Sequence, residues 1–386
     1  MRAKNILFAI FDLNDTNYMK MPWALFVRTL PIIAEKIPDA KIYVLTDTKN
    51  CSTVRRLIEK DNLKLISSSR PILRYPYKGL SATLEVLCKR LDIDTLVVLS
   101  GWSIHVWNRI AGKLKINNLI LIVLTPVYKT NDLLTMSLDY FTSSLNYGRP
   151  EDLIYLTKLI FENLIIRLLL KIVKFSNKPT IIVASEDNKE LFQNHGFETY
   201  KINFKLKYNI TGDRIFQSKS NPSIAYFGVP LIARGYDIVI ELAKPIPDID
   251  FVLYLRERLP AITRKKMHKG LRNLRTVFKF FHSMEDLIAE ARRHNLLLLP
   301  FRFVISDFPL IVVEVLCSGR LVVTTKYSHV DLIKMPNLVT LDLVQVKNPS
   351  IIRRLAEREF SIPISSCCID WEFVADELSR FLGLHK

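Results

Sequence analysis

The chain has 386 residues, of which 49% are hydrophobic and 24% charged, so it is globular and long enough for two domains of about 150–200 residues. Lysine and arginine exceed aspartate and glutamate by 55 − 38 = 17, which favours phosphate groups on a nucleotide, a nucleic acid or an anionic membrane, or else reflects a well-solvated basic surface. No run of about 18 uncharged apolar residues occurs, and the opening MRAKNILFAIFDLND is typical of a core strand, so we expect neither a membrane span nor a signal peptide.

The cysteines are odd in number and lack the spacing of a metal site. They predict reduced thiols in a cytoplasmic protein. The five positions are Cys51, Cys88, Cys317, Cys367 and Cys368.

Short apolar runs alternate with helical patterns in the first half, which predicts a parallel sheet covered by helices. Polar stretches such as NYMKMPW and YKTND follow these runs, where open α/β sheets bind ligands. The strand candidates are 5–11, 41–47, 95–101, 118–125 and 180–186.

The segment 151–175, EDLIYLTKLIFENLIIRLLLKIVKF, predicts a long helix that is apolar on more than one side. One interpretation is a core helix of the first domain. The other is an interfacial helix whose Leu, Ile and Phe enter a membrane while Lys158, Arg167, Lys171 and Lys174 meet anionic headgroups.

A polar, basic segment then interrupts the pattern, and a second βα series follows it. We expect an α/β protein with two Rossmann-like, doubly wound domains that face each other across a cleft. The predicted boundaries are 1–206, a linker at 207–222, 223–369, and a final helix at 370–386 that crosses back. The strand candidates of the second series are 223–228, 250–255, 276–281, 295–301, 320–325 and 338–342.

The stretch SDFPLIVVEVLCSG, 306–319, contains one carboxylate, Glu314, in an otherwise apolar run. A preceding buried strand, Pro309 and Gly319 predict a helix from about Phe308 to Ser318 whose N-terminus suits phosphate. Glu314 then either accepts hydrogen bonds from a ribose diol or points to solvent.

At these residues the chain resembles the retaining GT-B glycosyltransferases of the family-4-like type. LLLLPFRFVISDFPLIVVEVLCSGRLVVTT resembles their signature, in which L-P-S-x-x-E-G-F-P-L is followed by three residues and E-A-M-A-x-G. SIAYFGVPLIARGYDIVIELA resembles their G-R-L-x-x-x-K-G strand and helix, and VFKFFHSMEDLIAEARRHNLLLLP resembles their base-binding loop. The resemblance covers about 220–330 well and the first half only in its βα rhythm.

The resemblance implies that the second domain binds a sugar nucleotide and the first an acceptor. Glu314 matches the second Glu of the E-x7-E pair and would hold the ribose, while Arg234 matches the phosphate-binding Lys of x-K-G. The implied remaining donor contacts are Gly228, the backbone N–H groups of Phe308 and Leu310, and the base loop at His282 and Ser283.

The sequence also departs from the family pattern. The first Glu of the pair falls on Ser306, with Asp307 beside it, and the family's Arg after the first glycine is Val229. Arg256, Arg258 or Arg302 would have to replace that charge. These departures leave open a catalytically impaired GT-B protein that binds nucleotide sugars or acts as a scaffold.

The resulting prediction is a retaining, metal-independent hexosyltransferase of glycan biosynthesis that uses a UDP- or GDP-sugar and needs no further cofactor. Arg234 would stabilise the leaving diphosphate, and His105 in SGWSIHVW would contact a sugar unless it is structural. The expected acceptor is a lipid-linked sugar or glycan, met on the cytoplasmic face of an anionic membrane by a peripheral protein. Nucleic acid is not expected, because no RNA-binding, zinc-finger or helix-turn-helix motif accompanies the charge.

Overall fold

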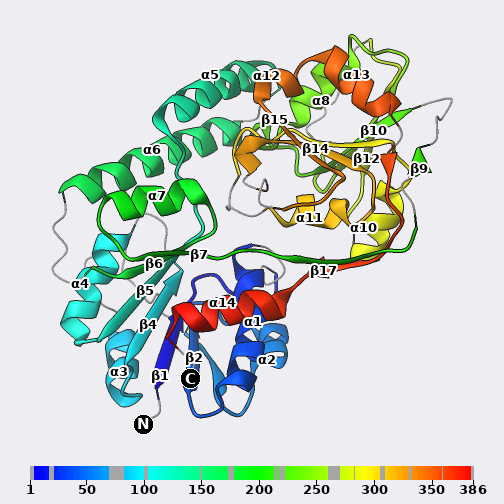
Figure 1. Cartoon of the computed structure of the whole chain (residues 1–386). Coiled ribbons are helices and arrows are strands. Elements are labelled where there is room, and N and C mark those ends of the chain that lie inside the picture. Colours follow the sequence, from blue (N-terminus) through cyan, green and yellow to red (C-terminus); the bar gives the residue numbers. More distant parts are fainter. Residues whose placement is uncertain are drawn as a thin grey trace. The chain divides into compact units, whose positions relative to one another are not determined.

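The computed structural model contains two compact units, one made of 1–128, 162–204 and 370–386 and the other of 129–161 and 205–369 (Figure 1). We call them unit 1 and unit 2. The structure describes residues 4–16, 21–68, 82–99, 103–147, 150–172, 178–212, 215–216, 222–259, 270–281, 283–304, 309–328, 330, 333–358 and 360–383.

Unit 1 is built on a parallel seven-stranded sheet with the strand order β3-β2-β1-β4-β5-β6-β7. Its strands are β1 Asn5–Ala9, β2 Lys41–Thr46, β3 Leu63–Ser67, β4 Thr95–Leu99, β5 Asn118–Val123, β6 Thr180–Val183 and β7 Thr199–Lys201. Its helices are α1 Trp23–Lys36, α2 Ser52–Ile58, α3 Ala82–Arg90, α4 Ile104–Leu114, α7 Glu186–Asn194 and α14 Trp371–Phe381, together with the second half of α6 Pro150–Ile172.

The core of unit 1 explains why these runs become central strands. Leu7, Leu96, Val98 and Leu121 are fully buried and pack with Trp107 of α4 on one face of the sheet. The alternate residues Ile6, Phe8 and Val97 are buried as well, so both faces are covered. The last helix, α14, packs on α1, and Glu377 accepts hydrogen bonds from the backbone and side chain of Asn203.

Unit 2 contains a parallel six-stranded sheet with the order β12-β11-β10-β13-β14-β15. The strands are β10 Ser223–Gly228, β11 Asp250–Leu255, β12 Leu274–Phe278, β13 Leu296–Leu299, β14 Leu321–Thr325 and β15 Leu338–Leu341. Its helices are α5 Thr130–Tyr147, the first half of α6, η1 Ile232–Arg234, α8 Tyr236–Ala243, α10 Met284–Ala291, α11 Leu310–Leu316, η2 Lys326–Ser328, α12 Leu343–Val346 and α13 Pro349–Glu357.

Both sheets reverse direction beside their first strand, between β1 and β4 and between β10 and β13. This is the strand order of doubly wound dinucleotide-binding domains, in which ligands bind beyond the carboxyl ends of the strands at the reversal. The predicted α/β class with two doubly wound sheets is confirmed.

Two parts of the predicted organisation differ from the structure. The predicted linker 207–222 contains β8 Leu206–Ile210 and β9 Ile215–Phe216, which pair with β17 Ile364–Ile369 and β16 Phe360–Ser361. The segment 129–161, predicted within 1–206, packs with unit 2. The reason is that α5 carries Tyr140 and Asp139, whose partners lie in the second half of the chain.

The prediction of reduced thiols is wrong for two of the cysteines. Cys317 and Cys367 form a disulfide whose Cα atoms are 5.3 Å apart, while Cys51, Cys88 and Cys368 carry free thiols. Cys317 caps the end of α11, and the strand β17 passes beside it. As for spanning elements, none of the helices in the described ranges is both long and apolar enough to cross a bilayer.

Candidate functional site

The loop after β10 is fixed by one glycine. Gly235 has φ +77°, a left-handed conformation, and a Cβ there would lie 2.0 Å from the carbonyl oxygen of Pro300. Only glycine fits this position without strain. It follows directly on Arg234 and brings η1 against the loop after β13, so the neighbouring carboxyl ends of β10 and β13 are joined at the sheet reversal.

Arg234 lies at this junction. Its guanidinium is 4.9 Å from the ring centroid of Phe301, and the backbone N–H groups of Arg302 and Phe303 donate to the carbonyl of Ala233. The stacking on Phe301 holds a cation at the end of the two strands. Arg234 therefore lies at the carboxyl ends of β10 and β13, next to Gly235, and its role in phosphate binding stays a prediction.

Arg256 and Glu314 complete this group. Arg256 follows β11, and its backbone N–H donates to the carbonyl of Gly228 at 3.1 Å. Burial raises the pKa of the Glu314 carboxyl above its usual value, and the positive charge of Arg256 opposes that rise. A carboxylate and two arginines are thus held by the chain beyond β11, β10 and β13, and we call Arg234, Arg256 and Glu314 the edge group.

An exposed aromatic ring adjoins the edge group. The guanidinium of Arg256 lies 6.0 Å from the ring centroid of Phe280, and 60% of the side-chain surface of Phe280 is exposed. An exposed aromatic face beside a cation can stack on a flat ring of a ligand. Phe280 was not predicted from the sequence, and the available signal was KFFHS, a pair of phenylalanines after an apolar strand.

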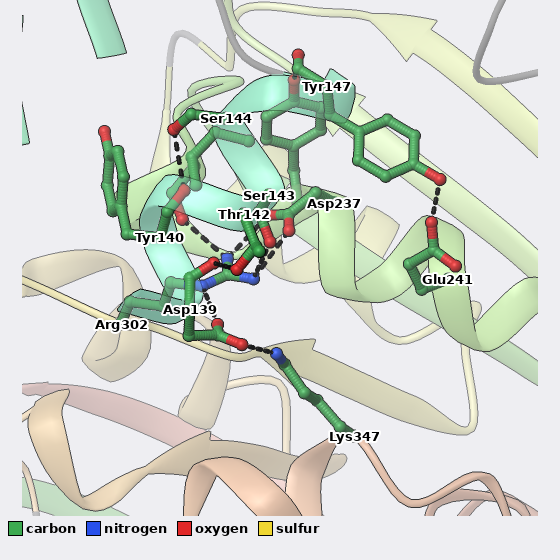
Figure 2. A network of polar contacts seen from close by, with 12 residues as sticks. Asp139, Tyr140, Thr142, Ser143, Ser144, Tyr147, Asp237, Glu241, Arg302 and Lys347 are labelled. Carbon is green, nitrogen blue, oxygen red and sulfur yellow. Dashed lines mark hydrogen bonds and ion pairs between the residues drawn. The ribbon is translucent and has the colours of Figure 1, made fainter. Parts of the chain in front are cut away.

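Arg302 has a different environment (Figure 2). Its side chain is fully buried, and it donates to Asp237 through both terminal nitrogens at 2.7 Å, to the carbonyl of Ile232, to the hydroxyl of Ser143 and to Asp139. These contacts occupy all the N–H donors of the guanidinium. Burial lowers the pKa of Arg302, but Asp237 and Asp139 outweigh it, so the pKa is raised overall.

The suggestion that Arg302 replaces a phosphate-binding arginine is therefore wrong. Its donors hold α5, η1 and α8 together, and Lys347 adds a second cation on Asp139. Neither Asp237 nor Asp139 was selected from the sequence. A lone arginine between Phe301 and Phe303 after a buried strand was the available signal for a buried ion pair.

The remaining predicted donor contacts fall into three groups. Ser306, Asp307, Phe308 and His282 lie outside the described residues. Ser283 is the N-cap of α10, since its hydroxyl accepts from the N–H of Asp286 at 3.1 Å. Leu310 is the first residue of α11, which is shorter than the predicted helix of about 308–318.

His105 belongs to unit 1, in the first turn of α4 after β4. Its Nδ1 is buried, and no hydrogen-bond partner for it occurs among the described residues. Burial lowers the pKa of the imidazole below 6.5, so the ring is neutral at pH 7. A neutral, partly buried ring at the sheet reversal of unit 1 can accept a hydrogen bond from a hydroxyl group.

The edge group combines the chemistry that a nucleoside diphosphate requires. Arginines bind phosphate oxygens, and a carboxylate accepts two hydrogen bonds from vicinal hydroxyls. Its location beyond the carboxyl ends of β10, β11 and β13 is the usual ligand position of a doubly wound sheet. Within the described residues, no three His, Cys, Asp or Glu side chains gather as metal ligands.

The chain resembles several proteins of known structure in fold, although not in sequence. No family model and no curated protein sequence matches it. Sucrose-phosphate synthase from Thermosynechococcus elongatus has a TM-score of 0.55 at 11% identity, covering 98% of this chain and 94% of its own. A glycosyltransferase from Rickettsia africae has a TM-score of 0.55 at 11% identity, covering 100% and 95%. HepE from Anabaena, in complex with UDP, has a TM-score of 0.54 at 14% identity, covering 98% and 97%. The chain therefore has the GT-B fold of these proteins.

Proposed function

We propose that the chain is a glycosyltransferase that binds a nucleotide-diphosphate sugar at the edge group of unit 2. The observation that carries the proposal is Glu314, a half-buried residue of α11 whose carboxyl pKa is raised by burial and lowered again in part by the positive charge of Arg256. Such a carboxylate is costly in a protein interior unless a ligand or a cation partners it, and a ribose diol provides that partner. The UDP complex of the structurally similar HepE supports a UDP donor.

The proposed reaction retains configuration and uses no metal. The bond between the sugar and the diphosphate breaks, its electron pair goes to the diphosphate, and Arg234 with Arg256 stabilises the added negative charge. The acceptor hydroxyl attacks from the same face, and its proton passes to the departing phosphate oxygen. Unit 1 takes the acceptor, with His105 as a hydrogen-bonding contact to a sugar hydroxyl.

We further propose a hexose donor and a lipid-linked sugar or glycan acceptor, reached from the cytoplasmic face of a membrane. The net charge of +17 supports an acceptor that lies in an anionic membrane. The test is to incubate the protein with UDP- and GDP-sugars and lipid-linked acceptors, and to follow acceptor mass. A gain of one hexose residue is expected, with Arg234→Ala reducing the rate by about a hundredfold or more.

A second function, nucleotide-sugar binding without transfer, has one specific observation in its favour. Val229 occupies the position of the family's phosphate-binding arginine, and its carbonyl accepts a hydrogen bond from the hydroxyl of Tyr226 at 2.8 Å. Donor binding without either transfer or donor hydrolysis would select this function. Arg256 is the residue that would compensate for Val229, so loss of transfer in Arg256→Ala would argue against it.

A further inference from the structure

Large exposed apolar side chains are concentrated on α5 and α6. On α5, Leu134 is 59% exposed, Leu138 71%, Phe141 49% and Leu145 64%. The first half of α6, in the same unit, adds Leu153 at 38%, Ile154 at 69% and Phe161 at 62%, and its second half, in unit 1, adds Leu164 at 53%, Leu168 at 55% and Ile172 at 66%. Elsewhere in the described ranges such residues are scattered: Leu57, Val86, Tyr208, Ile210, Phe280 and Val344.

The four apolar residues of α5 recur at intervals of four, three and four, which places them on one face of the helix. The opposite face is anchored, because Leu133, Met136 and Tyr140 are buried and the Tyr140 ring packs against Phe303 at 5.8 Å between centroids. The apolar face is therefore held outward from unit 2 by the packing of the other face.

The outward surface of α5 has no charged residue. Its other exposed positions are threonine or asparagine, namely Thr130, Asn131, Thr135, Thr142 and Asn146. The two acidic residues of the helix are paired with unit 2: Asp139 with Arg302 and Lys347, and Asp132 with Lys326. Exposed Lys158 lies between Ile154 and Phe161 along α6.

We propose that α5, with the start of α6, is the surface by which the protein docks on an anionic lipid bilayer. Leu and Phe side chains enter the region between headgroups and acyl chains, while Thr, Asn and Lys158 contact the headgroups. A second copy of the chain is the other apolar partner that fits such a face. The net charge of +17 disfavours it, because like-charged copies repel each other and an anionic surface attracts.

The inference rests on the proposed function only in that a lipid-linked acceptor explains why docking is useful. It also extends the lipid contact that the sequence suggested. The predicted interfacial segment was 151–175, and α6 exposes large apolar side chains there beside exposed Lys158 and Lys171, while the outward face of α5 carries no charge. That helix does not cross a bilayer, so docking is peripheral.

The test is flotation of the full-length protein with phosphatidylcholine vesicles that contain or lack phosphatidylglycerol. Wild type should float mainly with the anionic vesicles. The double variant Leu138→Gln/Phe141→Gln should lower partitioning about tenfold or more, because it removes two apolar side chains from the face that enters the membrane. Lys158→Glu should lower partitioning about fivefold or more on anionic vesicles only.

The matched control is Leu57→Gln/Val86→Gln, which removes two exposed apolar side chains from α2 and α3 and should float like wild type. Equal flotation of the α5 variant and wild type, or no flotation of wild type, would overturn the proposal. So would a lipid-free dimer, seen by light scattering, that the α5 variant converts to monomer. UDP binding measured on the same samples separates the two proposals: vesicle binding without UDP binding contradicts only the transferase, and UDP binding without vesicle binding contradicts only the docking surface.

Discussion

Unit 2 contains two groups of charged residues that lie close together in the chain and have opposite physical characters. In the first, Arg302 is fully buried and gives all its donors to Asp237, Asp139, Ser143 and Ile232. In the edge group, the charge of Arg256 does not cancel the effect of burial on Glu314, whose pKa stays raised. The first group is satisfied by the protein, and the second leaves a carboxylate whose environment improves if a ligand arrives.

The difference shows how charge should be interpreted in this fold. An arginine beside a sheet reversal is not evidence for phosphate binding until its donors have been counted, and Arg302 fails that count. Arg256 is exposed, and its positive charge acts on the carboxyl of Glu314. Substitutions in the first group should therefore change stability, whereas substitutions in the edge group should change ligand binding.

The largest effect is expected for Arg302→Ala. The substitution removes the guanidinium that pairs with buried Asp237. It should lower the free energy of unfolding, measured by urea denaturation, by about 3–5 kcal/mol. Arg353→Ala is the control, since its exposed bidentate pair with Asp248 should contribute less than about 1 kcal/mol. Equal losses for the two variants would show that the buried network does not stabilise unit 2.

The next effect concerns the disulfide that ties the end of α11, the helix of Glu314, to β17. Closing a loop over a sequence separation of 50 should stabilise the protein by about 2–4 kcal/mol, which Cys367→Ala would remove. Thiol titration of the denatured protein should find three reactive thiols without reductant and five with it. Five without reductant would contradict the bond.

Gly235 joins the two groups, since it lies between Arg234 and Asp237. Gly235→Ala should lower the free energy of unfolding by about 2–3 kcal/mol, because the residue has φ +77° and its Cβ would meet Pro300. Gly270→Ala is a matched control with the same φ and nothing within 4 Å of the added Cβ, and should cost only about 1 kcal/mol. Denaturation midpoints of the two variants measure the part due to the close approach.

The smallest effect is a pH dependence. Because burial raises the native pKa of Glu314 above 4.5, the native state binds more protons than the unfolded state between 4.5 and the raised value. The stability of wild type should therefore fall, relative to that of Glu314→Gln, as pH rises through that window, and the two should converge below it. A constant difference across pH would contradict a buried carboxyl.

The sequence predicted the elements whose signal is local. Apolar runs such as SIAYFG and DFVLYL became β10 and β11 with the expected bounds, because both faces of a parallel sheet are covered. The strands β8 and β17 were missed because neither is apolar on both faces. They pair with each other although they lie at opposite ends of the segment 205–369 in the sequence, so no local pattern indicates them. The helix α5 was missed because its outward face carries leucines where a solvated helix shows charges.

Candidate residues were identified where a motif fixes the backbone and missed where partners are distant, and the roles of those residues in binding stay predictions. Gly235 and Glu314 stand in local patterns, and the structure places them at the sheet reversal. The pairing of Arg302 with Asp139 and Asp237 joins three separate segments, so no spacing along the chain indicates it. The pairing of Cys317 with Cys367 was hidden for the same reason.

The most direct test of the central claim is calorimetric titration of the protein with UDP and GDP. Wild type should bind one of them saturably, Glu314→Ala should weaken that binding by about tenfold or more, and the exposed α10 control Glu285→Ala should not change it. Wild-type affinity in Glu314→Ala would contradict the ribose assignment. Absence of binding by wild type to either nucleotide would contradict the nucleotide site itself.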